Sequence, residues 1–166
     1  LEAAGYDVTR EFYINDSGNQ IERFGMSLEA RYIQLLKGEE AVEFPEDGYK
    51  GEDITDHMRD FIEENGDGLL EADSSERRKT LVEYALPKNI DRIRKGLDNY
   101  GVRFDNWFSE QSLFDGGELE ETIRLLKEKG LTYKKEGALW FKASSYGCEK
   151  DEVIVPGYTE DDSVAY

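Results

Sequence analysis

Within the first 38 residues a strand pattern, a polar turn and a helix pattern follow one another, and this order constrains the fold most. Residues 6–14 place most of their apolar side chains at every second position, as a strand does. The polar run 15–18 ends that pattern, and Ser17 with Gln20 matches the capping box of a helix start. A strand, a turn and a helix are half of a βαβ unit, which predicts an α/β fold.

The rest of the chain predicts helices separated by glycine-containing loops, followed by a short hairpin. The longest apolar stripe runs over residues 82–100, and Pro87 within it predicts a kink or a break. The dipeptide Glu136-Gly137 predicts the hairpin turn. Other predicted helices lie between Ser17 and Gly38, over 54–62 and over 119–126, and other strands over 102–108, 131–135, 138–143 and 153–155. The predicted core contains Phe61, Val82, Leu86, Ile90, Ile93, Trp107, Phe108 and Trp140.

The chain is strongly acidic, but its charge is unevenly distributed. With 21 basic and 38 acidic side chains among 166 residues, the formal net charge of −17 argues against attraction of the whole surface to nucleic acid or to an anionic membrane. Residues 77–148 nevertheless carry 14 basic and 11 acidic side chains, a local net charge of +3. There Lys88, Arg92 and Lys95 share one face of the predicted long helix. They are candidates for contact with a phosphate backbone, with ion pairs along the helix as the alternative.

Few residues point to catalysis by themselves. Cys148 is the only cysteine and His57 the only histidine, which excludes a disulfide within the chain and the usual structural zinc sites. We expect His57 to be a half-exposed surface histidine, and we predict no catalytic residue and no metal ligand. No apolar run is long enough to cross a membrane, so no membrane partner is expected.

Five segments carry a resemblance to a known family. They are residues 4–21 (AGYDVTREFYINDSGNQI), 45–51 (PEDGYKG), 101–110 (GVRFDNWFSE), 126–130 (LKEKG) and 137–141 (GALWF). In sequence, order and spacing they resemble arginyl-tRNA synthetase, a class I aminoacyl-tRNA synthetase, and the resemblance covers roughly residues 2–155.

This resemblance implies a fold, an activity and a division of the chain. Residues 1–37 would be a Rossmann-type strand and helix of the catalytic domain, and residues 38–155 an α+β connective insertion of about four helices and a small, mostly antiparallel sheet. Residues 156–166 would be an acidic tail that departs from the family pattern. Members of the family use ATP with Mg²⁺ to attach arginine to tRNA in the cytoplasm, and the connective insertion of related enzymes faces the tRNA acceptor end.

The resemblance also implies roles for individual residues. Asn15, Asp16 and Gln20 would lie at the rim of the active site, because ligands bind at the carboxyl ends of parallel strands. The alternative is that these three side chains satisfy only the turn and the helix cap. Trp107 and Trp140 match the family too, and for both we favour packing in a core over stacking on a base.

The resemblance implies that the chain is one part of an enzyme, and this limits the activity and binding that we expect of the chain alone. The HIGH-type and KMSKS-type motifs that hold ATP in this family do not occur in the chain. We therefore expect the chain alone to be inactive and to bind no cofactor. It would serve as scaffold and as a contact surface for the tRNA acceptor end, with weak or no binding of nucleic acid. Strand 6–14 would have open edges, which predicts concentration-dependent dimerisation or fraying of residues 1–16, unless the strand pairs again within the chain. The alternatives are a stand-alone acidic protein-interaction module and a hydrolase that uses clustered carboxylates with a metal.

Overall fold

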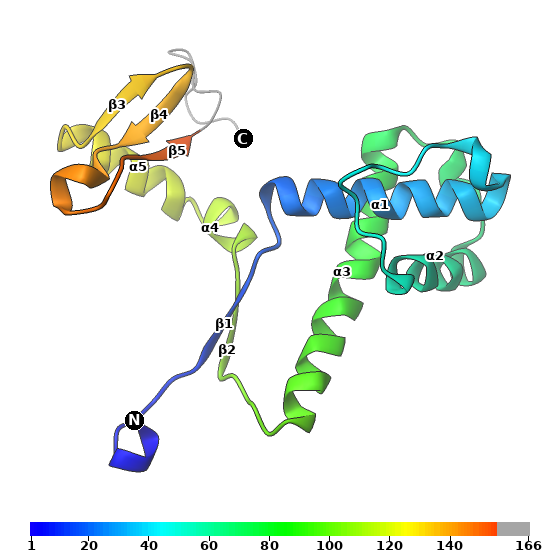
Figure 1. Cartoon of the computed structure of the whole chain (residues 1–166), viewed down its shortest axis with the longest axis horizontal. Coiled ribbons are helices and arrows are strands. Elements are labelled where there is room, and N and C mark those ends of the chain that lie inside the picture. The colour runs from blue at the N-terminus through cyan, green and yellow to red at the C-terminus, as the bar shows by residue number, and fades with distance from the viewer. Residues whose placement is uncertain (156–166) are drawn as a thin grey trace. The chain divides into compact units, whose positions relative to one another are not determined.

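The computed structural model describes residues 1–155, which form two compact units that divide after Glu110. The first unit contains the long helices and a pair of strands, and the second contains a small sheet with two further helices (Figure 1). The predicted α/β class is confirmed. The predicted acidic tail, residues 156–166, lies outside the described residues. No helix within residues 1–155 is both long enough and apolar enough to cross a membrane.

Three helices build the core of the first unit, namely α1 (Gly18–Lys37), α2 (Glu52–Asn65) and α3 (Ser74–Asn99). Short 3-10 turns lie at η1 (Glu2–Ala4), η2 (Glu39–Ala41) and η3 (Gly68–Leu70). The core consists of apolar residues that recur at helical spacing, Phe24, Leu28, Tyr32, Ile54, Met58, Phe61, Leu81 and Ala85. The predicted capping box is wrong, because Ser17 is the N-cap of α1 but its side chain makes no capping hydrogen bond.

Helix α3 differs from its prediction in two ways. It is continuous through Pro87, so the predicted break does not occur; Pro87 and Glu83, whose carbonyl loses its helical donor, are both exposed to water. Its core-facing residues are Leu81 and Ala85, whereas Ile93, predicted for the core, is 45% exposed. The reason is that α1 and α2 pack against the first half of α3, and no other helix described in this unit covers its second half (Figure 1).

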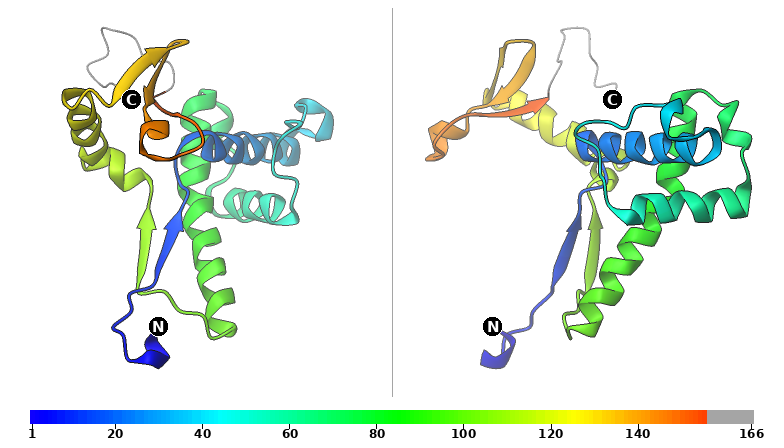
Figure 2. Two further views of the ribbon diagram at one scale, coloured as in Figure 1. Left: turned by 60° about the vertical axis from the view of Figure 1, so that its left-hand side comes forward. Right: turned by 45° about the vertical axis from the view of Figure 1, so that its right-hand side comes forward.

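A pair of parallel strands completes the first unit. Strand β1 (Glu11–Ile14) lies beside β2 (Asn106–Ser109) and pairs with it (Figure 2). In this register Phe12 lies opposite Trp107. Both strands are shorter than predicted. The expectation that β1 has two open edges is wrong for one edge, because β2 occupies it. The sequence between the strands contains all three long helices, which is the kind of connection that parallel strands need.

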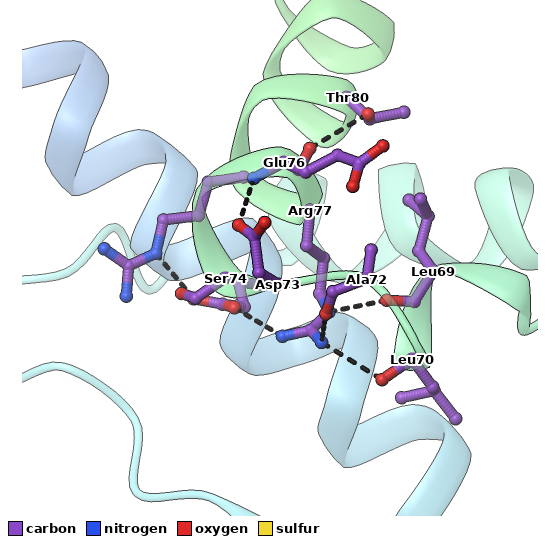
Figure 3. A network of polar contacts seen from close by, with 10 residues as sticks. Leu69, Leu70, Ala72, Asp73, Ser74, Glu76, Arg77 and Thr80 are labelled. Carbon is purple, nitrogen blue, oxygen red and sulfur yellow. Dashed lines mark hydrogen bonds and ion pairs between the residues drawn. The ribbon is translucent and has the colours of Figure 1, made fainter.

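A cluster of charges around the buried pair Glu29 and Arg77 joins α1 to the start of α3, and Figure 3 shows the contacts of Arg77. The Glu29 carboxylate accepts hydrogen bonds from Arg77 at 2.7 Å, Arg78 at 2.6 Å and Ser74 at 3.0 Å. Arg77 also donates to three backbone carbonyl oxygens, those of Leu69, Leu70 and Ala72. A buried ion pair with its remaining donors satisfied in this way does not leave an unpaired charge in the core.

The second unit has a three-stranded antiparallel sheet, in agreement with the predicted small, mostly antiparallel sheet, although the strand predicted over 102–108 pairs with β1 instead. Its elements are α4 (Gln111–Asp115), α5 (Glu118–Glu128), β3 (Thr132–Lys135), β4 (Ala138–Phe141), the 3-10 turn η4 (Ala143–Tyr146) and β5 (Glu152–Val155), with strand order β3-β4-β5. The predicted hairpin is confirmed, and Glu136 and Gly137 both have positive φ, 55° and 70°, as a two-residue hairpin turn requires. The core of the unit contains Ile123, Leu139 and Val155.

Candidate functional site

The carboxyl ends of β1 and β2 bring polar residues together. Asp16, which follows β1, accepts a hydrogen bond from Ser109 Oγ at 2.6 Å. The backbone N–H of Glu110 donates to the Ile14 carbonyl oxygen at 3.0 Å, so the parallel pairing continues to this edge. Asn15 lies on the same edge. This is the edge at which parallel α/β sheets bind their ligands, and it is the candidate site.

A cavity of about 500 Å³ lies within the first unit beside this edge. Most of its lining is apolar and comes from β1, α1, α2 and α3, from residues 49–51 before α2, and from Trp107 of β2. Its polar side chains are Asn15, Gln20, Lys50, Asp53, Asn89 and Arg92. An apolar cavity of this size with a few convergent polar groups suits a small organic ligand. Two of the three predicted rim residues, Asn15 and Gln20, line the cavity, while Asp16 is bonded to Ser109 instead.

His57 is not the half-exposed surface residue that the sequence suggested. It is 8% exposed, and its Nε2 lies 2.8 Å from Asn89 Oδ1, an acceptor, so Nε2 carries the proton and donates. The error arose because the helix face of α2 that bears His57 and Met58 packs inward, although acidic residues surround it in sequence. The contact holds Asn89 in position at the wall of the cavity.

The three candidate phosphate-binding residues of α3 have different surroundings. Lys88 contacts Tyr84 Oη and lies 3.5 Å from Glu64, and the hydrogen bond with Tyr84 raises the pKa of Lys88 above its ordinary value. Lys95 forms an ion pair with Asp91 at 2.6 Å. Arg92 lines the cavity. The ion pairs considered as the alternative therefore exist for Lys88 and Lys95.

The two tryptophans make contacts of different kinds. Trp107 stacks on Phe12, with ring centroids 4.6 Å apart, and the Arg94 guanidinium lies 4.6 Å from its ring centroid. Trp140 stacks on Tyr133 across β3 and β4. Both indoles are partly buried, so neither is a fully enclosed core residue.

Sequence reasoning missed two residues of the site and found no metal site. Ser109 and Glu110 were not selected, although they directly follow the predicted strand 102–108, as Asn15 and Asp16 directly follow the predicted strand 6–14. Within residues 1–155 no three His, Cys, Asp or Glu side chains are grouped so that they could hold a metal ion. Cys148 is a free, exposed cysteine.

Comparisons with known proteins point to one enzyme. The chain is 78% identical over 155 residues to the arginine–tRNA ligase of Acetivibrio thermocellus, and 66% identical over the same length to that of Ruminiclostridium cellulolyticum. Each match covers 93% of this chain and 28% of the relative. No family model matches the chain.

A solved structure agrees with these sequence matches. The crystal structure of an inferred arginyl-tRNA synthetase from Campylobacter jejuni superposes with a TM-score of 0.76 at 33% sequence identity. The match covers 94% of this chain and 33% of that one. The chain therefore spans about a third or less of the length of the proteins it resembles.

Proposed function

Because this chain is a homologue of a segment of arginine–tRNA ligases, we propose that it works within a longer enzyme that attaches arginine to tRNA with ATP. The observation that carries the proposal is the 78% identity, which extends over 93% of the chain. Identity at this level over nearly the whole chain argues against a stand-alone acidic interaction module. Such a module would need only its negative charge, and not the sequence of a ligase.

The edge formed by β1 and β2 is proposed to be the rim of the active site of that enzyme. Asn15 and Gln20 would face the substrate, since both line the cavity beside the edge. Asp16 would position the rim, because its bond to Ser109 links the two strand ends. Glu110 would join them as a carboxylate at the same edge.

The division of the chain is proposed along the lines that the resemblance implies. Residues 1–37 would belong to the Rossmann-type domain, and β2 would belong with them since it forms the parallel partner of β1. The remaining residues of 38–155 would form the connective insertion. We assign no function to residues 156–166.

ATP and Mg²⁺ are proposed for the longer enzyme and not for this chain. In the described residues, no three carboxylate, histidine or cysteine side chains are grouped as metal ligands. The chain also has no glycine-rich phosphate loop ending in Lys-Ser or Lys-Thr. When bound, ATP would activate the arginine carboxylate, and this chain would help to shape the site.

Contact with the tRNA acceptor end is proposed for Lys88, Arg92 and Lys95. The ion pairs of Lys88 with Glu64 and of Lys95 with Asp91 are open to solvent, so phosphates can exchange for these carboxylates at little cost. At low salt we expect weak binding of an acceptor-stem minihelix ending in CCA, stronger than binding of a scrambled hairpin. Affinity should fall as salt rises.

A triple variant tests this contact. Lys88→Gln, Arg92→Gln and Lys95→Gln together should weaken minihelix binding by about tenfold or more, measured by fluorescence anisotropy. The matched control neutralises three other exposed basic residues, Lys37, Arg59 and Lys79. Equal loss in both variants, or no binding to the unmodified chain, would contradict the contact.

The chain alone should also show no arginine-dependent ATP–pyrophosphate exchange, and exchange that survives repurification would contradict the proposed inactivity.

A further inference from the structure

We propose that one face of the β3-β4-β5 sheet binds unpaired nucleotides, with bases stacking on Tyr133 and Trp140. This rests on the proposed function and deepens it, because it names the surface that would receive the unpaired 3′ end of the tRNA. The partner is a single-stranded ribonucleotide segment.

The two faces of this sheet have different surroundings. Leu139 of β4 and Val155 of β5 point toward α5 and pack with Ile123 in the core of the unit. Side chains alternate along a strand, so Trp140 points to the opposite face. Tyr133 lies directly across from Trp140, and Val153, which is 44% exposed, lies across from it on the other side. The aromatic pair therefore occupies the face that α5 does not cover.

The two rings are held in place by their polar atoms. Their planes lie within 18° of one another, with centroids 6.3 Å apart. Tyr133 Oη donates to Asp151 at 2.9 Å, and Trp140 Nε1 donates to the Lys135 carbonyl oxygen at 3.0 Å. Asp151 in turn accepts from the backbone N–H of Ser144 at 2.9 Å. Both residues are partly exposed, so a ligand would meet ring surface and not their polar atoms, and fixed rings lose little entropy on binding.

The charge around this unit favours an anionic partner. Residues 127–142, which include β3 and β4 but do not all lie on this face, carry five lysines and two glutamates, a net charge of +3 within a chain of −17. Lys135 Nζ lies 5.7 Å from the centroid of the Trp140 ring. Acidic residues Asp151 and Glu152 lie on the β5 side, so a phosphate backbone would run along β3 and β4. Aromatic platforms beside basic residues bind single strands by stacking, largely without regard to base identity.

Tryptophan fluorescence tests the contact directly, because the chain has only two tryptophans. In the Trp107→Phe variant, Trp140 is the sole indole. A single-stranded RNA ending in CCA should quench the emission of Trp140, and the quenching should reach a plateau as RNA is added. In the Trp140→Phe variant, Trp107 should not be quenched. A blunt RNA duplex without unpaired nucleotides should quench neither. Quenching of Trp107 alone would overturn the proposal.

Variants measure the contribution of each ring. Tyr133→Leu and Trp140→Leu should each weaken RNA binding by about tenfold. Tyr133→Phe and Trp140→Phe keep a ring and should bind nearly normally. The matched control is Tyr146→Leu, since Tyr146 is a 63% exposed aromatic residue of the same unit, stacked on Phe141. Circular dichroism identifies any variant that has lost its fold, and the tyrosine variants keep the test valid if Trp140→Leu unfolds.

The outcomes separate this proposal from the proposed function. One outcome is that a CCA-ended minihelix binds without changing Trp140 emission, and with the same affinity for the Tyr133→Leu variant as for the unmodified chain. In that case the proposed stacking on the sheet face is wrong, and the proposed acceptor-end contact stands. If neither minihelix nor single strand binds at low salt, both are wrong. If Tyr146→Leu weakens binding as much as Tyr133→Leu does, the aromatic pair has no special role and the proposal fails.

Discussion

At the scale of single residues, two glycines inside helices have opposite environments. A Cβ at Gly96, in α3, would meet nothing within 4 Å. A Cβ at Gly25, in α1, would lie 3.3 Å from Val82 Cγ2 and 3.4 Å from Arg78 Cβ. Gly25 therefore allows the close approach of α1 and α3, whereas Gly96 costs the helix conformational entropy without such a gain.

This contrast predicts opposite effects of the same substitution. Gly96→Ala should raise the free energy of unfolding by up to about 1 kcal/mol, because alanine is the better helix former. Gly25→Ala should gain less or lose stability, since its methyl group must displace Val82 and Arg78. Urea unfolding followed by circular dichroism measures both. Equal stabilisation by the two substitutions would show that α1 and α3 do not approach closely at Gly25.

At the scale of elements, the Glu29 cluster holds α1 against the start of α3. Burial by itself raises the pKa of Glu29, but hydrogen bonds from Arg78, Ser74 and Arg77 outweigh burial and bring the pKa below its ordinary value of 4.5. A carboxyl whose pKa is lower when folded stabilises the fold fully above its unfolded pKa. That stability is lost as the pH falls through the folded pKa.

Removal of this charge should therefore reduce both stability and its dependence on pH. Glu29→Gln should lower the free energy of unfolding at pH 7 by about 3 kcal/mol, because Arg77 would stay buried beside a neutral partner. Its stability should also change less than that of the unmodified chain between pH 6 and about pH 3. The control is Glu83→Gln, whose exposed carboxylate lies 4.0 Å from Lys79 and should contribute under about 0.5 kcal/mol. Similar losses in both variants would contradict the role of burial.

At the scale of the whole molecule, the β1-β2 pair is too small to be a stable sheet alone. Arg10 and Ile14 direct their carbonyl oxygens to β2, so the alternating backbone groups of Glu11 and Tyr13 point to the other edge of β1. A two-stranded parallel sheet is unusual in proteins, because parallel sheets are normally extended and covered on both faces. The other edge of β1 is thus a place for pairing with a second copy.

We predict concentration-dependent self-association through that edge. Sedimentation velocity should show dimers that increase with concentration. Glu11→Pro, which removes an outward N–H, should shift the equilibrium toward monomer, while Glu11→Ala should not. A monomer at all concentrations, or equal effects of both substitutions, would exclude association through β1.

The sequence alone determined the elements whose signals are local. The apolar spacing of α1 and α2, the Glu136-Gly137 turn and the aromatic strand β2 depend on neighbours along the chain, and so does the resemblance to a synthetase. Tertiary structure decided what depends on distant partners. Other helices pack on only the first half of α3, so Ile93 in the second half is exposed. His57 is buried against Asn89, and β1 pairs with a strand more than 90 residues later in the chain. Periodicity shows that a face is apolar, but burial depends on which other element covers it, and that is set by contacts far apart in sequence.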